Sequence, residues 1–405
     1  MKTKPTILLA ALGLAVCLQS AQAQLLIPSD GSDGAMAPDG ATTNVVIDLS
    51  RAVTGDWNVD NSANAGKGIY DPSKWAVVFK YSSVNIPAGV TVSFINHPTH
   101  APVVWLVQGS VTNFGMIDLS GGANRGGVNA LVPVEPAPGG FRGAPSGPAG
   151  SGYGLGPGGS PQDGNGFPTA ASYNGVYGNP QILPLIGGSG TSGGGGYSGG
   201  GGGGAILIAA SGVLHNDGVI SAAGGWVSMG SYGASRLGSG GAVKVIASRV
   251  SGAGEINCLG GGPGRTRIQT DYLAPSLRVY PETIAATNTI PPQIWPPETT
   301  PTVRIVSVGP DASTNASVFV PADPTAPLVS SADVAIENEA QAVITLETKN
   351  LPIEGVVQVR AASKWGGASW VNASYASGDR ARATWLAPYT FPKGYTTLQA
   401  RATAP

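Results

Sequence analysis

The sequence is poor in charge, cysteine and histidine. Charged residues make up 11% of the chain, whereas about a quarter is usual for soluble domains. The formal net charge is −1, which leaves no electrostatic footprint for binding nucleic acid or anionic lipid. With three histidines and two cysteines, no catalytic constellation stands out, and we predict no catalytic, cofactor-binding or metal-binding residues.

Cysteine is almost absent from the expected mature chain. Cys17 lies in an N-terminal segment that we expect to be removed, which leaves Cys258 as the one remaining thiol. An intramolecular disulfide is therefore excluded in the mature chain, and stability has to come from β packing.

Long apolar runs are also scarce. Residues 7–18 form one apolar stretch of about the length of a signal-peptide core, too short to span a bilayer. Lys2 and Lys4 precede it, and Ala21-Gln22-Ala23 supplies the small residues that signal peptidase needs. We predict a signal peptide over residues 1–23, cleaved after Ala23, and no transmembrane segment elsewhere.

This segment predicts a secreted or extracytoplasmic protein, in the periplasm, at the outer surface or in the medium. An alternative interpretation makes Cys17 a lipid anchor, because Leu14-Ala15-Val16-Cys17 loosely resembles a lipobox. The branched Val16 stands where a small residue is expected, so we favour cleavage.

Glycine is abundant: 62 residues, about twice the usual share. Hydrophobic residues make up 42%, enough for real cores. Helical periodicity is almost absent after the signal, and short β-branched runs bounded by turn residues recur instead. They include residues 45–47, 75–79, 90–94 and 103–107. An all-β fold is predicted.

Three segments superpose on a shared glycine: residues 103–122, 205–225 and 242–261. A repeat of about 20 residues with inward apolar positions is typical of a parallel β-helix or related solenoid, and pairs of antiparallel hairpins in a sandwich are the alternative. The matching positions are the glycines Gly115, Gly218 and Gly254, the isoleucines Ile117, Ile220 and Ile256, and then Leu119, Ala222 and Cys258.

The same superposition predicts which side chains point outward. Lys244 stands between two apolar positions of its strand and must point away from the core. Aligning Val104 with Ile206 gives Trp105 and Leu207 the same outward orientation, and Trp105 becomes a candidate ligand contact.

The predicted domain organisation follows from composition. A β-helix-like domain spans residues 24–271 and carries a glycine-rich insertion at about 121–204, which is either a binding face or a flexible linker. We expect deletion of residues 139–197 to leave the core intact. A Pro-rich linker at 272–301 precedes a strand series at 302–405 that suits a small immunoglobulin-like sandwich without its cysteine pair.

One resemblance covers residues 30 to 265. The stretch from Trp75 to Gly127, the motif PGGFRG at 138–143 and the later GGGGAILIAASG resemble glycine-rich, β-helical exported or surface proteins of environmental Gram-negative bacteria, a poorly characterised family. The resemblance implies a surface or secreted protein, and it transfers no catalytic residues.

Candidate chemistry elsewhere is weak. His97 and His100 are three residues apart on an extended segment and would point to different faces, which disfavours a metal pair. Asp30, Asp33 and Asp39 resemble a calcium loop but lack its alternating acids, so a flexible acidic N-terminus is favoured.

Trp365 and Trp370 flank a Gly-Gly-Ala-Ser loop and are further candidate ligand contacts, since exposed aromatic rings stack on sugars. We therefore expect an exported, non-enzymatic surface or matrix protein, a structural or adhesive scaffold. Its expected partners are polysaccharides, cell-envelope components or copies of itself. The alternative is a β-helix carbohydrate-active enzyme, a polysaccharide lyase or hydrolase. Clustered acids on the outward faces of neighbouring repeats would distinguish this enzyme from the non-enzymatic scaffold.

Overall fold

A computed structural model describes residues 25–122, 134–144, 154–156, 158–159, 177–193, 198–226, 237–283, 285–310, 329–336, 339–363, 369–392 and 394–405. They form β-strands and two short 3-10 helices, η1 (Leu49–Arg51) and η2 (Ser62–Asn64), with no α-helix among them. The prediction of an all-β fold is confirmed. No helix in these ranges is long and apolar enough to cross a membrane. The predicted signal peptide lies outside the described residues.

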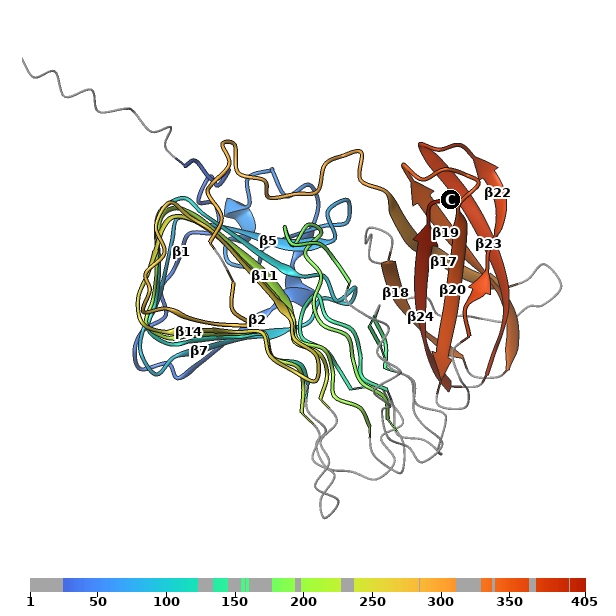
Figure 1. Cartoon of the computed structure of the whole chain (residues 1–405), viewed down its shortest axis with the longest axis horizontal. Coiled ribbons are helices and arrows are strands. Elements are labelled where there is room, and N and C mark those ends of the chain that lie inside the picture. The colour runs from blue at the N-terminus through green and yellow to red at the C-terminus, as the bar shows by residue number, and fades with distance from the viewer. Residues whose placement is uncertain are drawn as a thin grey trace, which may run out of the picture.

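Two large sheets of nearly all parallel strands build the N-terminal part (Figure 1). The first sheet is parallel except for the β4–β5 pair. Its ten strands are β1 (Ala35–Met36), β3 (Val53–Thr54), β4 (Ile69–Asp71), β5 (Ala76–Tyr81), β6 (Ser83–Ile86), β8 (Val103–Val107), β9 (Val111–Asn113), β11 (Ala205–Asn216), β13 (Ala242–Ser251) and β15 (Arg265–Gln269).

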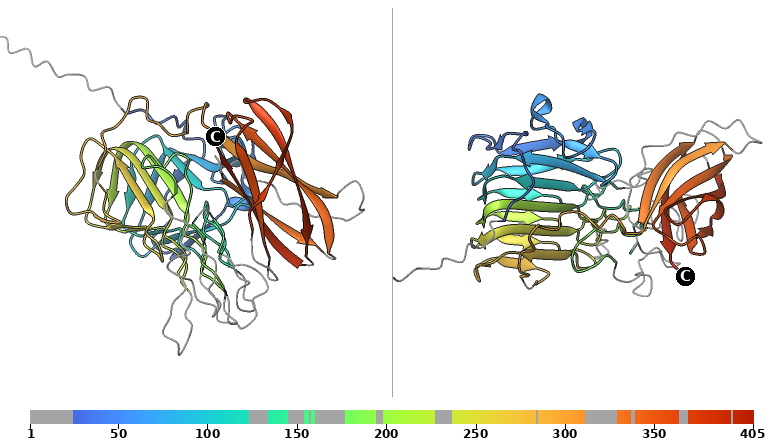
Figure 2. Two further views of the ribbon diagram at one scale, coloured as in Figure 1. Left: turned by 45° about the vertical axis from the view of Figure 1, so that its right-hand side comes forward. Right: turned by 90° about the horizontal axis from the view of Figure 1, so that it is seen from above.

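The second sheet is parallel throughout. From β6 onward the chain passes back and forth between the two sheets, and successive passes lie in layers (Figure 2). The predicted strands at 45–47, 75–79, 90–94 and 103–107 coincide with β2, β5, β7 and β8, to within two residues at their ends. The six strands of this sheet, in spatial order, are β16 (Arg278–Tyr280), β14 (Glu255–Asn257), β12 (Val219–Ser221), β10 (Met116–Asp118), β7 (Thr91–Ile95) and β2 (Asn44–Asp48).

The superposed glycines stack directly on one another. The N–H of Val219 donates to the carbonyl of Gly115, and the N–H of Glu255 donates to that of Gly218. A Cβ on Gly218 would lie 2.0 Å from the Gly115 oxygen. Glycine is needed here because one backbone lies directly against the next.

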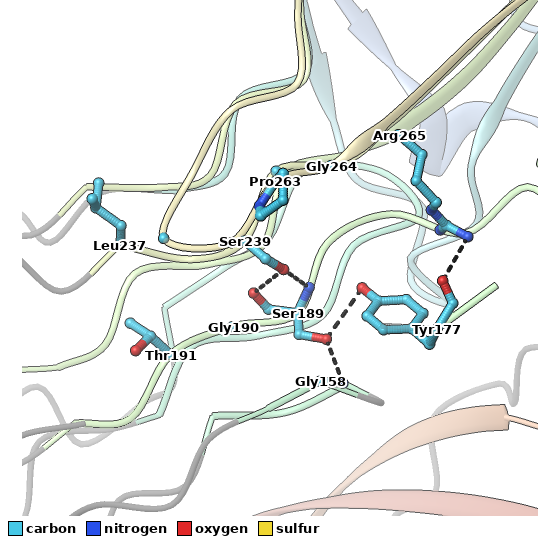
Figure 3. Close-up of a pocket in the computed structure, with 13 residues that line it drawn as sticks. Gly158, Tyr177, Ser189, Gly190, Thr191, Leu237, Ser239, Pro263, Gly264 and Arg265 are labelled. Carbon is cyan, nitrogen blue, oxygen red and sulfur yellow. Dashed lines mark hydrogen bonds between the residues drawn. The ribbon is translucent and has the colours of Figure 1, made fainter. Parts of the chain in front are cut away.

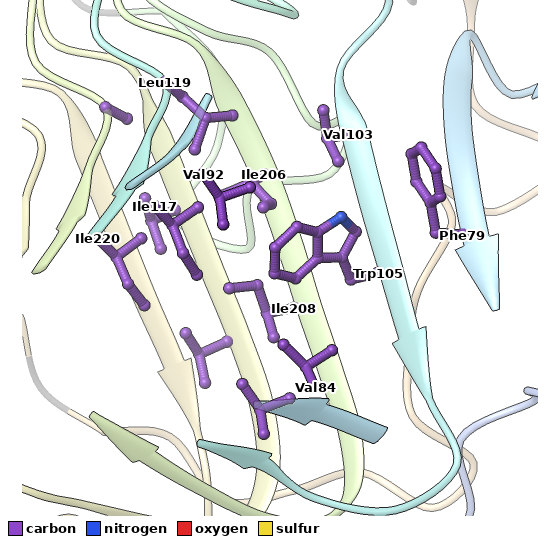
Figure 4. Close-up of a cluster of buried hydrophobic side chains, with 14 of the residues drawn as sticks. Phe79, Val84, Val92, Val103, Trp105, Ile117, Leu119, Ile206, Ile208 and Ile220 are labelled. Carbon is purple, nitrogen blue, oxygen red and sulfur yellow. The ribbon is translucent and has the colours of Figure 1, made fainter. Parts of the chain in front are cut away.

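The predicted isoleucine ladder is confirmed and is longer than expected. Ile117 pairs with Ile220, and Ile220 pairs with Ile256. The column continues through Val92 and Val45 at one end and through Val279 at the other. These side chains face the interior between the two sheets (Figure 4).

Cys258 is buried, as its place in the alignment with Leu119 and Ala222 predicts. All three side chains are at most 1% exposed and belong to the same core cluster. Burial raises the pKa of the Cys258 thiol to about 11, so the thiol is protonated and unreactive at neutral pH.

The predicted orientation of Trp105 is wrong. Ile206 pairs with Val103 and Ile208 pairs with Trp105, so the correct alignment is shifted by one residue from the predicted one. Because side chains alternate along a strand, this shift moves Trp105 to the interior, where it is fully buried (Figure 4). Its ring lies 5.7 Å from Tyr81 and 6.3 Å from Phe94, centroid to centroid.

Six extended segments beside the sheets form what we call the glycine bundle: residues 119–122, 137–144, 187–192, 199–204, 222–225 and 237–241. In the central segment, residues 199–204, N–H groups three residues apart donate to the same neighbouring segment. This spacing is the repeat of a polyproline-II helix. The bonds, at 2.8 to 3.1 Å, run from Gly199 and Gly202 to Ala144 and Phe141, from Gly201 and Gly204 to Gly122 and Leu119, and from Gly203 to Ser239.

The bundle leaves no room for side chains at its contacts. An added Cβ would lie 1.9 Å from the Gly188 oxygen at Gly202 and 1.8 Å from the Gly204 oxygen at Gly241. Apolar side chains at its margin enter the main core, since Phe141, Leu155 and Ile186 are at most 4% exposed. The described part of the insertion is thus neither a flexible linker nor free surface, and deletion of residues 139–197 would remove core side chains.

Two antiparallel sheets build the C-terminal part, and apolar side chains from both sheets form one shared core. The strand series predicted at 302–405 is present as β17 to β24. One sheet contains β17 (Thr302–Pro310), β19 (Ala340–Lys349), β23 (Arg382–Phe391) and β22 (Ser374–Gly378), and the other contains β18 (Val329–Ile336), β24 (Gly394–Thr403), β20 (Val356–Ser363) and β21 (Val371–Asn372).

A glycine-to-alanine series tests the bundle. Gly202→Ala and Gly241→Ala should each lower the free energy of unfolding by about 3 kcal/mol or more, because the methyl group overlaps a carbonyl oxygen. Gly262→Ala is the matched control, since its nearest neighbour would be 3.7 Å away, and it should change stability by less than about 1 kcal/mol. Urea unfolding followed by circular dichroism measures the difference. Equal stability of all three variants would contradict close packing.

Candidate functional site

The three tryptophans predicted to contact ligand have different surroundings. Trp105 is buried in the core and offers no face to a ligand. Trp365 lies outside the described residues. Trp370 is half-buried, and the guanidinium carbons of Arg401 and Arg360 lie 4.1 Å and 4.9 Å from its ring centroid. Its π-face is therefore already engaged by cations.

The two histidines of the His-Pro-Thr-His segment do not converge. His97 is buried, stacks on Tyr70 at 4.0 Å, and shares a hydrogen bond of 2.9 Å with the Thr99 hydroxyl. Burial lowers its pKa to about 4, which keeps the ring neutral. His100 instead lies 3.1 Å from Glu135. No group of three or more metal-ligating side chains occurs in the described part of the chain.

The acidic N-terminal loop is ordered by backbone and amide donors. Asp33 is buried and accepts from the Asn61 amide at 2.6 Å, from the Lys80 N–H at 2.7 Å and from the Gly66 N–H at 3.0 Å. Asp30 forms an ion pair of 2.7 Å with the Lys80 ammonium. These carboxylates hold the first turns of the fold in place, and the predicted flexible N-terminus is wrong for this loop.

Lys244 faces away from the core, as predicted, but it is covered. Its ammonium donates to the Gln293 carbonyl at 3.0 Å, and its side chain is about as inaccessible as the core. Burial, together with the nearby Arg267 charge, lowers the pKa of Lys244 to about 7. The Pro-rich segment therefore closes over the outer face of the first sheet.

Replacing Lys244 tests this burial. The folded pKa of about 7 lies below the unfolded value of about 10.4, so the unfolded state binds more protons between these limits and wild-type stability rises with pH there. Lys244→Met lacks that rise and should be about 1–4 kcal/mol more stable below pH 7. Urea unfolding from pH 6 to 10, with the exposed Lys67→Met as control, measures it. A difference that stays constant with pH would contradict the burial.

One cavity of about 440 Å³ opens beside the glycine bundle (Figure 3). Its walls are largely backbone of residues 189–191, 239–240 and 261–264. Two side chains give it chemical character, the phenol of Tyr177 and the guanidinium of Arg265, which is the first residue of β15.

Hydrogen bonds fix the polar groups of this cavity. The Tyr177 hydroxyl donates to the Gly187 carbonyl at 2.6 Å and accepts from the Ser189 hydroxyl at 3.2 Å. The Ser189 N–H donates to the Ser239 hydroxyl at 2.6 Å, and the Gly158 N–H donates to the Ser189 hydroxyl at 3.0 Å. Burial raises the pKa of Tyr177, which stays neutral.

Arg265 is a half-buried cation without a carboxylate partner within 4.0 Å in the described ranges. Its two terminal nitrogens donate to the Tyr177 carbonyl at 3.1 Å and to the Ile186 carbonyl at 2.7 Å. Its guanidinium carbon lies 5.2 Å from the Tyr177 ring centroid. Burial lowers the pKa of Arg265, although a guanidinium stays charged at any physiological pH. An anionic or hydroxyl-rich ligand suits such a wall.

The sequence contained one signal for this site. At the start of each pass the first sheet carries small apolar residues, Ala205 and Ala242, but the residue of β15 that pairs with Ala242 is Arg265. A charged residue at a covered position is a candidate for function or for fastening a neighbouring segment. Tyr177 follows a glycine-rich stretch without periodicity and could not be found from sequence.

A serine, a histidine and an aspartate also stand in a row. His215 bonds to the Ser251 hydroxyl at 3.0 Å and to the Asp217 carboxylate at 2.9 Å. The order resembles a nucleophile relay, but such relays need a buried acid and an oxyanion site. The His215 and Asp217 side chains are 36% and 39% exposed. We assign this row to stabilising the paired ends of β11 and β13.

No protein-family model, no curated protein and no solved structure matches this chain.

Proposed function

We propose that this chain is an exported, non-enzymatic surface or matrix protein, a rigid scaffold that binds carboxylated envelope polysaccharide. Its architecture would be a parallel β-helix with glycine-rich insertions followed by an immunoglobulin-like sandwich. Further partners would be other envelope components or copies of itself.

The path of the chain supports the β-helix. From β6 to β16 it alternates between two parallel sheets, and equivalent residues such as Ile117, Ile220 and Ile256 form columns. Two facing four-stranded antiparallel sheets with a single core support the sandwich.

The distribution of acids supports a non-enzymatic role. Glycoside hydrolysis commonly uses two carboxylates about 5 to 9.5 Å apart, which neighbouring strands of a stack can supply. The outward column through Asp118 continues with Ser221 and Asn257. The column through Glu255 contains Val219 on one side and Arg278, 3.6 Å from the carboxylate, on the other. Each column holds one acid.

The observation that carries the binding proposal is Arg265 in its cavity. A guanidinium offers five N–H donors, and within the described residues Arg265 bonds only to two carbonyls. Residues 189–191 and 239–240 of the walls belong to the hydrogen-bonded glycine bundle, which fixes their backbone. A preformed cationic wall of this kind binds a carboxylate without a large ordering cost.

Calorimetric titration of the mature protein with polygalacturonate and alginate tests the proposal, with neutral dextran as reference. Arg265→Gln should weaken binding at least about tenfold through loss of a charged hydrogen bond. Arg278→Gln, at an exposed arginine of β16 in the second sheet, is the matched control and should bind like wild type.

Arg265→Lys separates binding from folding, because it keeps the charge while losing the forked contact to two carbonyls. Thermal unfolding of each variant shows whether the fold persists. Unchanged binding by folded Arg265→Gln would contradict the proposal. Release of reducing ends or unsaturated products from either polymer would favour the carbohydrate-active enzyme instead.

Export is tested separately. Mass spectrometry of the protein recovered outside the cytoplasm should find Gln24 at the N-terminus. Close packing just after this position supports the proposal, because Leu25 and Ile27 are at most 4% exposed and the Ile27 N–H donates to the Ser211 hydroxyl at 3.0 Å. An acylated Cys17 would overturn it in favour of a lipid anchor.

A further inference from the structure

A second site lies on the opposite side of the first sheet from the interior core. Two tryptophans that the sequence did not single out, Trp57 and Trp295, meet there with ring centroids 5.5 Å apart and planes tilted by 55°. Both rings are half-buried and rest on the apolar cluster that covers this outer face. They come from segments more than two hundred residues apart in the chain.

The two rings border adjoining crevices. One, of about 450 Å³, is lined by Trp57, Asp56, Asn58 and the turn at 71–74. The other, of about 210 Å³, is lined by Trp295 and shares Ser73 and Lys74 with the first. The two crevices thus adjoin, with an aromatic side chain in each, and we call them together the Trp57–Trp295 trough.

Trp57 is held in position before any ligand arrives. The carboxylate of Asp71, a residue that is 4% exposed, accepts from the backbone N–H of Trp57 at 3.3 Å and from the backbone N–H of Ser73 at 2.7 Å. The buried Asp71 carboxylate therefore fixes both the backbone of Trp57 and the turn at 71–74 beside it.

Trp295 is fixed by its neighbours in the Pro-rich segment. Ile294 is buried in the outer-face cluster, and the Gln293 carbonyl accepts from the buried Lys244 ammonium at 3.0 Å. Pro296 and Pro297 follow directly and restrict the backbone. Side chains that are ordered in advance bind a ligand at lower entropic cost.

The polar groups of the trough suit hydroxyls better than a net charge. Asp56 and Asn58 are exposed, and the Lys74 ammonium lies 6.0 Å from the Trp295 ring centroid. An acid, an amide and an amine together accept from and donate to several hydroxyl groups, and the acid and amine charges balance. Indole rings offer flat apolar faces to the C–H groups of a pyranose.

We propose that the Trp57–Trp295 trough binds consecutive hexopyranose units of a neutral glycan. The inference rests on the proposed role as a glycan-binding scaffold, and it adds a second site of different chemistry. The cavity at Arg265 selects carboxylates, whereas this trough stacks uncharged sugar rings.

Titration of the mature full-length protein with neutral hexasaccharides of β-1,4-glucose, β-1,3-glucose, α-1,4-glucose and β-1,4-mannose tests this, followed by calorimetry and tryptophan fluorescence. At least one should bind and change the fluorescence. Trp57→Ala and Trp295→Ala should each weaken that binding about tenfold or more, as expected for aromatic anchors. Trp226→Ala, at a 54% exposed tryptophan elsewhere, should bind like wild type.

Asp56→Ala keeps the test valid if a tryptophan variant fails to fold, because Asp56 is exposed and contributes nothing to the core. It should weaken binding several-fold at unchanged thermal stability. Failure of all four hexasaccharides to bind, or binding insensitive to Trp57, Trp295 and Asp56, would overturn the trough. Loss of polygalacturonate and alginate binding in Arg265→Gln is a separate readout. The binding proposal for Arg265 can therefore fail or hold independently of the outcome with the neutral hexasaccharides.

Discussion

The structure depends on backbones that lie directly against one another. Hydrogen bonds between neighbouring extended segments bring carbonyl oxygens to within 2 Å of where a Cβ would stand, at Gly202, Gly241 and several other glycines. The sheets and the glycine bundle share this constraint, because Gly204 and Gly241 lead directly into the paired residues Ala205 and Ala242 of β11 and β13. The bundle therefore helps to set the register of the sheet.

The same constraint explains the unusual composition. Where one backbone segment forms hydrogen bonds to three neighbouring segments, its N–H and C=O groups are satisfied by other backbone groups. Few polar side chains are then needed in the interior. One of the buried side-chain pairs is a stack of amides, in which Asn113 donates to Asn216 at 2.7 Å. In the described residues, abundant glycine and low charge thus accompany a densely hydrogen-bonded stack.

Both candidate sites lie at the margins of this framework. The Arg265 cavity opens where the bundle meets the last strand of the first sheet, and the Trp57–Trp295 trough lies where the N-terminal turns meet the Pro-rich segment. In each case a rigid backbone positions a few side chains that differ from the rest of the chain. Such an arrangement is what the proposed recognition of a repetitive polymer would use.

The glycine and isoleucine repeats alone were sufficient to predict the β class, most strand positions and the buried Cys258, because those properties follow from local periodicity. They were insufficient for the orientation of Trp105, since a one-residue shift in pairing exchanges the two faces of a strand. Composition also suggested a flexible insertion, although its glycines form contacts with residues far away in the chain. The covered Lys244 and the meeting of Trp57 with Trp295 depend on segments brought together only by folding, and periodicity within one segment contains no information about such encounters.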